Sequence, residues 1–228
     1  MISSLYTPFK KWSSGGSVYL YSDPHFADEE IKYIRNNISD EEQVKRINSV
    51  VTPNDTLIML GDIGDVSFVS KLRGYKVLIM GNHDKGRSNY VLKTEVIIYD
   101  NLEEAQKAQA QGEVDVYDFK FEPPYYFGLK NNHLFNEVYE GPLMISDRII
   151  LSHEPLPNIP WALNIHGHDH SDWEGYNDGL HINVCAEFID WKPVNLMNVI
   201  KVGRLKNIPS IHRLTIDRAT NRNKEDNA

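Results

Sequence analysis

The sequence predicts an α/β fold that opens with a parallel sheet, and two observations support this. Residues 17–22 (SVYLYS), 56–60 (TLIML) and 75–80 (YKVLIM) are short apolar runs rich in residues that favour β-strands. Residues 40–47 lie between the first two runs and carry apolar side chains at helical spacing, with Asp40 placed to cap the helix. Strands joined by such crossovers lie parallel and side by side.

The rest of the chain predicts a second sheet in the same domain. Turn signals divide residues 114–151 into several short strands, and residues 102–111 (LEEAQKAQAQ) predict a polar, solvated helix. No repeat or long linker interrupts the chain, so we expect one domain over residues 1–228, with a flexible tail at 215–228. The remaining predicted elements are strands at 95–99, 164–166 and 180–184 and a short helix at 193–200.

Composition narrows the classes of function. The 228 residues are 41% hydrophobic and 25% charged, as in a globular protein, and the net charge is −8. This charge argues against a general nucleic-acid or membrane-surface binder, although a metal could still attract a small phosphorylated substrate. A single cysteine, no apolar run near the ~20 residues of a membrane span and no apolar segment typical of a secretory signal favour a cytoplasmic protein.

Short polar motifs follow five of the predicted strands. Because the loops after parallel strands meet at one edge of a sheet, we expect these motifs to converge there. Their oxygen and imidazole groups, with no thiolate among them, suit Mn²⁺, Fe, Zn²⁺, Co²⁺ or Ni²⁺ better than Ca²⁺ or Mg²⁺ alone. The motifs are Asp23-Pro24-His25, Gly61-Asp62-Ile63-Gly64-Asp65, Gly81-Asn82-His83-Asp84, Ser152-His153-Glu154 and His166-Gly167-His168-Asp169-His170.

In this order, from Asp23 to His170, the strings D-x-H, G-D-x-x-D, G-N-H-D, a later His and G-H-x-H resemble the calcineurin-like metallophosphoesterase superfamily. The resemblance implies a four-layer α-β-β-α sandwich, in which two mixed sheets have helices outside and a dinuclear metal site at the carboxyl edge of the strands. It also implies the ligands: Asp23, His25, Asp62 and His170 for one metal, and Asp62, Asn82, His153 and His168 for the other, with Asp62 as the bridge.

The same resemblance implies the reaction. A hydroxide bridging two divalent cations, most simply Mn²⁺, would attack a phosphodiester or phosphomonoester, with the diester favoured. His83 would act as the general acid, and Asp65 would orient its imidazole. The short layout resembles small bacterial or phage phosphoesterases. Phosphoprotein phosphatases of the superfamily have Arg-Gly after G-D-x-x-D, whereas Val66-Ser67 stand here, which argues against that activity.

Several residues keep two interpretations at this stage. Lys85, Arg87 and His166 are candidate substrate contacts, but such Lys and Arg residues are usually only solvated, and His166 is more simply interpreted as support for its loop. Cys185 is interpreted as a small buried hydrophobe. Residues 114–139 carry several tyrosines and are a candidate lid over the site. The competing function is a binding platform that keeps the fold with little or no catalysis.

Overall fold

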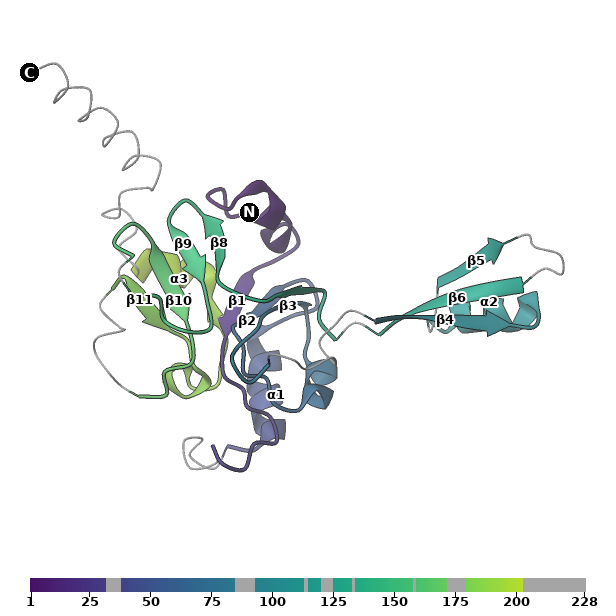
Figure 1. The fold of residues 1–228 in the computed structure, drawn as a ribbon, viewed down its shortest axis with the longest axis horizontal. Coiled ribbons are helices and arrows are strands. Elements are labelled where there is room, and N and C mark those ends of the chain that lie inside the picture. The colour runs from purple at the N-terminus through teal and green to yellow at the C-terminus, as the bar shows by residue number, and fades with distance from the viewer. Residues whose placement is uncertain are drawn as a thin grey trace, which may run out of the picture.

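The computed structural model describes residues 1–31, 38–84, 93–112, 115–119, 125–132, 134–157, 159–171 and 179–202. These residues form an α/β fold of three sheets and a few helices (Figure 1). The helical elements are η1 Thr7–Ser13, α1 Asp40–Val50, η2 Val66–Lys71, α2 Leu102–Ala110, η5 Ala186–Ile189 and α3 Leu196–Val202. The strands are β1 Val18–Tyr21, β2 Thr56–Met59, β3 Tyr75–Ile79, β4 Lys93–Tyr99, β5 Asp115–Phe119, β6 Tyr125–Asn132, β7 Glu137–Tyr139, β8 Leu143–Ser146, β9 Ile149–Leu151, β10 Leu163–His166, β11 His181–Asn183 and β12 Val194–Asn195.

The first sheet confirms the predicted parallel opening. Its strand order is β12-β1-β2-β3-β7, and β1, β2, β3 and β7 run parallel while β12 is antiparallel to β1. The register pairs Leu20 with Ile58 and Ile58 with Val77. The carboxyl ends of β1, β2 and β3 therefore lie at one edge, where three of the polar motifs begin.

The second sheet, in the order β11-β10-β9-β8, packs face to face with the first. It is also mixed, because β10 is parallel to β9 and β11 whereas β8 is antiparallel to β9. Leu20, Ile58 and Val77 from the first sheet share one apolar core with Leu151 and Ile165 from the second. This core fixes the two sheets against each other, and with them the loops at their edges.

Helix α1 and the 3-10 helix η2 cover the other face of the first sheet. Ile47 and Val69 from these helices pack with Leu57, Met59 and Leu78 in a second apolar core. The helix-capping prediction needs one correction, because Ser39 rather than Asp40 is the N-cap. The Ser39 side chain accepts a hydrogen bond from the backbone N–H of Glu42, and Asp40 forms the first helical turn.

A third sheet, β4-β6-β5, was not predicted, since the sequence indicated two. It is antiparallel, and it occupies the part of the chain between β3 and β7. Helix α2 contacts all three of its strands and buries Ala105 and Ala108, so the predicted solvated helix has one apolar face. Figure 1 shows this unit projecting away from the two core sheets. The lid expected over residues 114–139 falls partly outside the described residues.

Within the described ranges, none of the helices is long and apolar enough to cross a membrane.

Candidate metal centre

The backbone of the predicted ligand loops is unusual in conformation. Asp23, His25, Asp62 and His168 have positive φ angles of 55°, 42°, 51° and 68°. Residues other than glycine rarely adopt this left-handed backbone conformation, and those that do cluster at functional sites. Four of the seven predicted ligands therefore lie in strained backbone at the carboxyl edge of the strands.

Gly61 and Gly167 are among the glycines that the close approach of the loops requires. Gly61 has a φ of 95°, and a Cβ there would lie 2.7 Å from Nδ1 of His153. A Cβ on Gly167 would collide with the side chains of Ser22 and Asp23. Any larger residue would push apart loops that belong to different strands.

Asp84 ties two of the loops together, a role that the sequence did not predict. Its carboxylate is fully buried and accepts hydrogen bonds from three backbone N–H groups, those of Asp62 (2.7 Å), Ile63 (3.1 Å) and Gly81 (2.8 Å). The loop after β2 and the loop after β3 therefore hold each other in register.

Asp23 presents one carboxylate oxygen to the interior of the site. Its Oδ2 accepts hydrogen bonds from the Ser22 hydroxyl, from the backbone N–H of His168 (2.8 Å) and from the Cys185 thiol (3.2 Å). Its Oδ1 is buried and has no hydrogen-bond partner within the described residues. This oxygen lies 3.8 Å from Nε2 of His25 and 3.6 Å from Nε2 of His170.

The two histidines of this first group face the same point. His25 is buried, and its Nε2 also lacks a hydrogen-bond partner among the described residues. Burial lowers the pKa of His25, despite the nearby carboxylates, so the imidazole is neutral and able to act as a ligand. Nδ1 of His170 lies 2.6 Å from Oε1 of Glu187, which leaves its Nε2 directed at Asp23.

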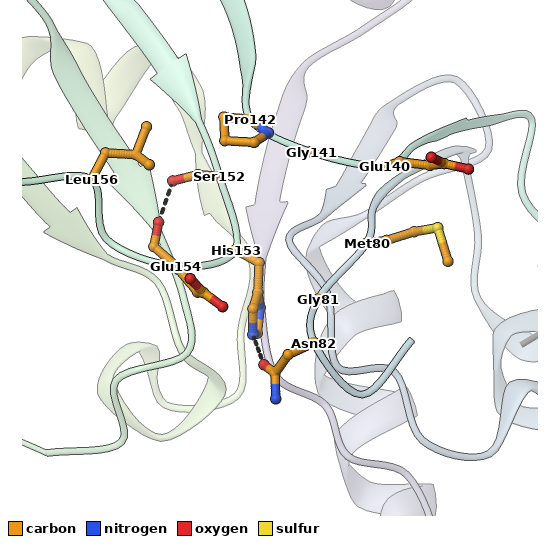
Figure 2. A pocket seen from close by; sticks show the side chains of 10 residues that line it. All are labelled: Met80, Gly81, Asn82, Glu140, Gly141, Pro142, Ser152, His153, Glu154 and Leu156. Carbon is orange, nitrogen blue, oxygen red and sulfur yellow. Dashed lines mark hydrogen bonds between the residues drawn. The ribbon is translucent and has the colours of Figure 1, made fainter. Parts of the chain in front are cut away.

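A second group lies beside the first. Nε2 of His153 is 3.3 Å from Oδ2 of Asp62, 2.8 Å from Oδ1 of Asn82 and 3.1 Å from Nδ1 of His168. Figure 2 shows His153 and Asn82 directed toward each other from different loops. Burial acts to lower the pKa of His153, but its hydrogen bond with Asp62 and the charges of Asp23 and Asp62 raise the pKa to about 9.

Asp62 lies between the two groups. Its Oδ2 is 3.8 Å from Nε2 of His25 in the first group and 3.3 Å from Nε2 of His153 in the second. Its Oδ1 accepts a hydrogen bond from the backbone N–H of His83 at 3.0 Å. Burial acts to raise the pKa of Asp62, but the bond with His153 and the adjacent imidazoles lower it, so the carboxylate is ionised.

These atoms form groups that could hold metal ions. Ligand atoms within 4.8 Å of one another belong to Asp23, His25 and His170 in one group, and to Asp62, His153 and His168 in another. A third group joins His170 with Cys185 and Glu187. The donor set fits divalent cations, because Oδ1 of Asp23 and Nε2 of His25 are buried near each other and neither has a hydrogen-bond partner among the described residues. All seven predicted ligands lie in or against the first two groups.

The predicted catalytic residues, His83 and Asp65, do not belong to the groups of candidate ligands. The His83 side chain is 60% exposed at the solvent side of the site, and its Nε2 lies 3.9 Å from Oδ2 of Asp62. Asp65 caps η2 by accepting a hydrogen bond from the backbone N–H of Ser67. In the described part of the chain no hydrogen bond or ion pair joins Asp65 to His83, so its orienting role stays a prediction.

The candidate substrate contacts divide in two. Lys85 and Arg87 lie outside the described residues. His166 is fully buried, and its Nδ1 lies 2.8 Å from the carbonyl oxygen of Gly167. Its burial favours the structural interpretation, in which His166 supports the loop that carries His168 and His170, over contact with substrate.

Cys185 and Glu187 are site residues that the sequence did not reveal. Cys185 is fully buried, as expected, but its thiol faces Asp23, and burial raises the pKa of that thiol. A parallel bridge pairs Cys185 with Ser22, directly after β1, and this pairing brings the segment beside His170. No motif marks either residue in the sequence, so only the pairing could have identified them.

A small cavity of about 100 Å³ opens beside the second group (Figure 2). Asn82 and His153 form one side, and Glu140 and Glu154 contribute exposed carboxylates. Pockets for drug-sized ligands are typically ~300–1,000 Å³. The space next to the second group therefore suits a small chemical group rather than a whole organic ligand.

Comparison with known proteins gives little. No family model matches the sequence, and no curated protein matches it. A crystal structure of a protein of unknown function from Aquifex aeolicus is similar at 22% identity, covering 82% of this chain and 98% of that one, with a TM-score of 0.49. A similarity this low supports no argument about function.

Proposed function

We propose that this chain is a dinuclear-metal-dependent phosphoester hydrolase of the calcineurin-like metallophosphoesterase superfamily. One observation carries the proposal: two groups of His and Asp ligands meet at Asp62, and Asp23 Oδ1 and His25 Nε2 are buried there without hydrogen-bond partners in the described residues. The four-layer sandwich belongs to the same proposal. The face-to-face sheets and the helical cover of α1 and η2 support it.

The unpartnered atoms matter because they are costly. Burying a polar atom without a hydrogen bond costs about 1–3 kcal/mol, and more for a charged group. A purely structural cluster would pair Asp23 Oδ1 with a donor, as it pairs Oδ2 with three. A cation held by Asp23, His25, Asp62 and His170 would compensate both unpartnered atoms at once.

The second position would be held by Asp62, Asn82, His153 and His168, with Asp62 shared. When bound, two such cations supply a nucleophile at neutral pH, by lowering the pKa of water, and neutralise charge on the phosphoryl oxygens. Among the metals that suit these ligands, Mn²⁺ is the one we propose.

His83 is proposed as the general acid. Its backbone N–H is held by Asp62 Oδ1, whereas its side chain is exposed above the groups, where a leaving oxygen could receive a proton from it. Asn82, next to it in the chain, is directed toward His153. One short loop after β3 would thus supply both a ligand and the acid.

A phosphodiester is the substrate class that we favour. The reacting phosphoryl group would lie at the metal centre, and the cavity of about 100 Å³ beside Asn82 and His153 would accept no more than a small substituent. Larger parts of a substrate would lie on the open surface near His83, whose side chain is 60% exposed.

The test uses purified full-length protein with Mn²⁺ and a nitrophenyl phosphodiester, beside the corresponding monoester. We expect hydrolysis that EDTA abolishes, with His83→Ala losing about 10²–10⁴-fold in kcat, the contribution of a general acid. Metal binding should be retained in His83→Ala, since its imidazole is not a proposed ligand.

The competing function, a binding platform without catalysis, predicts a different result. That protein would bind two cations yet show no hydrolysis of monoesters, diesters, cyclic nucleotides or nucleoside polyphosphates with Mn²⁺, Fe²⁺, Zn²⁺, Co²⁺ or Ni²⁺. The same panel would identify the preferred substrate class if hydrolysis is found.

A further inference from the structure

The two ligand groups differ in the acceptor that lies next to Nδ1 of His25, His170 and His153, on the side of the ring away from the proposed metal. In the first group, Nδ1 of His25 lies 3.3 Å from Oδ2 of Asp28, and Nδ1 of His170 lies 2.6 Å from Oε1 of Glu187. In the second group, Nδ1 of His153 lies 2.8 Å from the carbonyl oxygen of Leu60. Carboxylates therefore support the first group. In the second, His153 contacts a neutral carbonyl, and Oδ1 of Asp23, which belongs to the first group, is more distant from its Nδ1 at 4.0 Å.

This difference has a direct effect on metal affinity. A carboxylate that accepts the Nδ1 proton of a histidine fixes the tautomer, directs Nε2 to the cation and makes the imidazole a stronger donor. A carbonyl fixes the tautomer as well, but it adds no negative charge near the cation. Loss of such a supporting carboxylate typically weakens metal binding 10–100-fold.

The residues that would bind the metals directly also place more negative charge in the first group than in the second. The first group contains Asp23, whose Oδ1 is buried and unpartnered in the described residues, while the second contains the neutral amide of Asn82. Asp62 Oδ2 lies near both groups and does not distinguish them. The carboxylate of Asp23 and the supporting carboxylates of Asp28 and Glu187 therefore all favour binding of a cation in the first group.

We propose that the two metal positions have unequal affinity, that the position formed by Asp23, His25 and His170 fills first, and that Glu187 and Asp28 are the positioning residues responsible. This inference rests on the proposed metal centre. Glu187 has the larger effect of the two. Its side chain is 11% exposed against 32% for Asp28, and its contact with imidazole is shorter.

The experiment is calorimetric titration of the full-length, EDTA-treated protein with Mn²⁺. Wild type should show a tighter and a weaker binding event. His25→Ala should remove the tighter event and His153→Ala the weaker one. Removal of the tighter event by His153→Ala would overturn the assignment.

Glu187→Gln tests the positioning role, because the glutamine retains an acceptor oxygen but loses the charge. It should weaken the tighter event about 10-fold or more and leave the weaker event within about 2-fold. Asp28→Asn should act in the same direction by less. Glu41→Gln, an exposed residue of α1, is the control for loss of one negative charge and should change neither event.

A second readout separates positioning from general structural damage. One equivalent of Co²⁺ should occupy the tighter position, and its visible spectrum should change in Glu187→Gln but not in Glu41→Gln. Equal weakening of both events, or an unchanged tighter event, in Glu187→Gln would refute the inference. Two Mn²⁺ binding events of unequal affinity, without hydrolysis of any substrate, would instead refute the proposed catalysis and leave this inference standing.

Discussion

Replacing Asp84 should destabilise the fold and the metal centre together. The Asp84 carboxylate is fully buried and accepts backbone N–H groups of Asp62, Ile63 and Gly81. Asp84→Ala would leave all three donors without this acceptor, at about 1–3 kcal/mol each before relaxation. We expect a net loss of about 3–5 kcal/mol in the free energy of unfolding, since nearby groups and water recover part of the penalty.

Asp84→Asn should fall between wild type and alanine. Oδ2 accepts from both Asp62 and Gly81, whereas Oδ1 accepts only from Ile63. An amide can place its oxygen at the Oδ2 position and keep two bonds, with its NH₂ group facing the N–H of Ile63. The expected loss is about 1–3 kcal/mol, for one unsatisfied donor.

The assay is urea unfolding in EDTA, so that metal binding does not contribute, followed by Mn²⁺ titration of the same variants. Asp55 provides a matched control at the opposite end of β2. Its buried carboxylate also accepts backbone N–H groups, from Ser17 and Thr52. Asp55→Ala should lose stability but retain Mn²⁺ affinity. A loss below about 1 kcal/mol for Asp84→Ala would refute the argument.

Two further predictions concern the cations. Asp62→Asn should weaken both binding events, because its Oδ2 lies near both groups, and unchanged metal content by atomic emission would contradict the bridging role. Cation binding should tighten as the pH rises toward about 9, with release of a proton from His153, which calorimetry in buffers of different ionisation enthalpy would detect. Because the pKa of His153 is raised from 6.5 to about 9 in the folded protein, its contribution to metal-free stability should be full below pH 6.5 and lost as the pH rises through about 9.

The core strands were predictable because their signal is local. The apolar runs before Asp23, Asp62 and Asn82 became β1, β2 and β3 with bounds shifted by no more than one residue at either end. The helix cap was less predictable. Ser39 and Asp40 are both good capping residues, and only the backbone conformation decides between them.

The third sheet and the supporting residues of the site depend on pairing between distant segments. The strands β4, β5 and β6 look like ordinary sheet strands, and nothing in their sequences indicates that they pair only with one another. Glu187 reaches His170 because Cys185 bridges to Ser22 after β1, while Val184 donates its backbone N–H to the carbonyl oxygen of His166, the last residue of β10. Such contacts combine three parts of the chain and leave no local motif.

Asp84 also explains how the β4-β6-β5 unit and α2 can follow the proposed catalytic loop in the chain without disturbing it. Between Asp84 and β7 the chain forms the β4-β6-β5 unit with α2, and β7 then pairs with β3. Asn82 and His83 directly precede Asp84, and the backbone hydrogen bonds that Asp84 accepts from the loops after β2 and β3 fix the end of this short segment. Changes within the projecting unit therefore need not displace the ligands. The loop between Gly81 and Asp84 can keep its geometry while the unit beyond it varies in sequence and size.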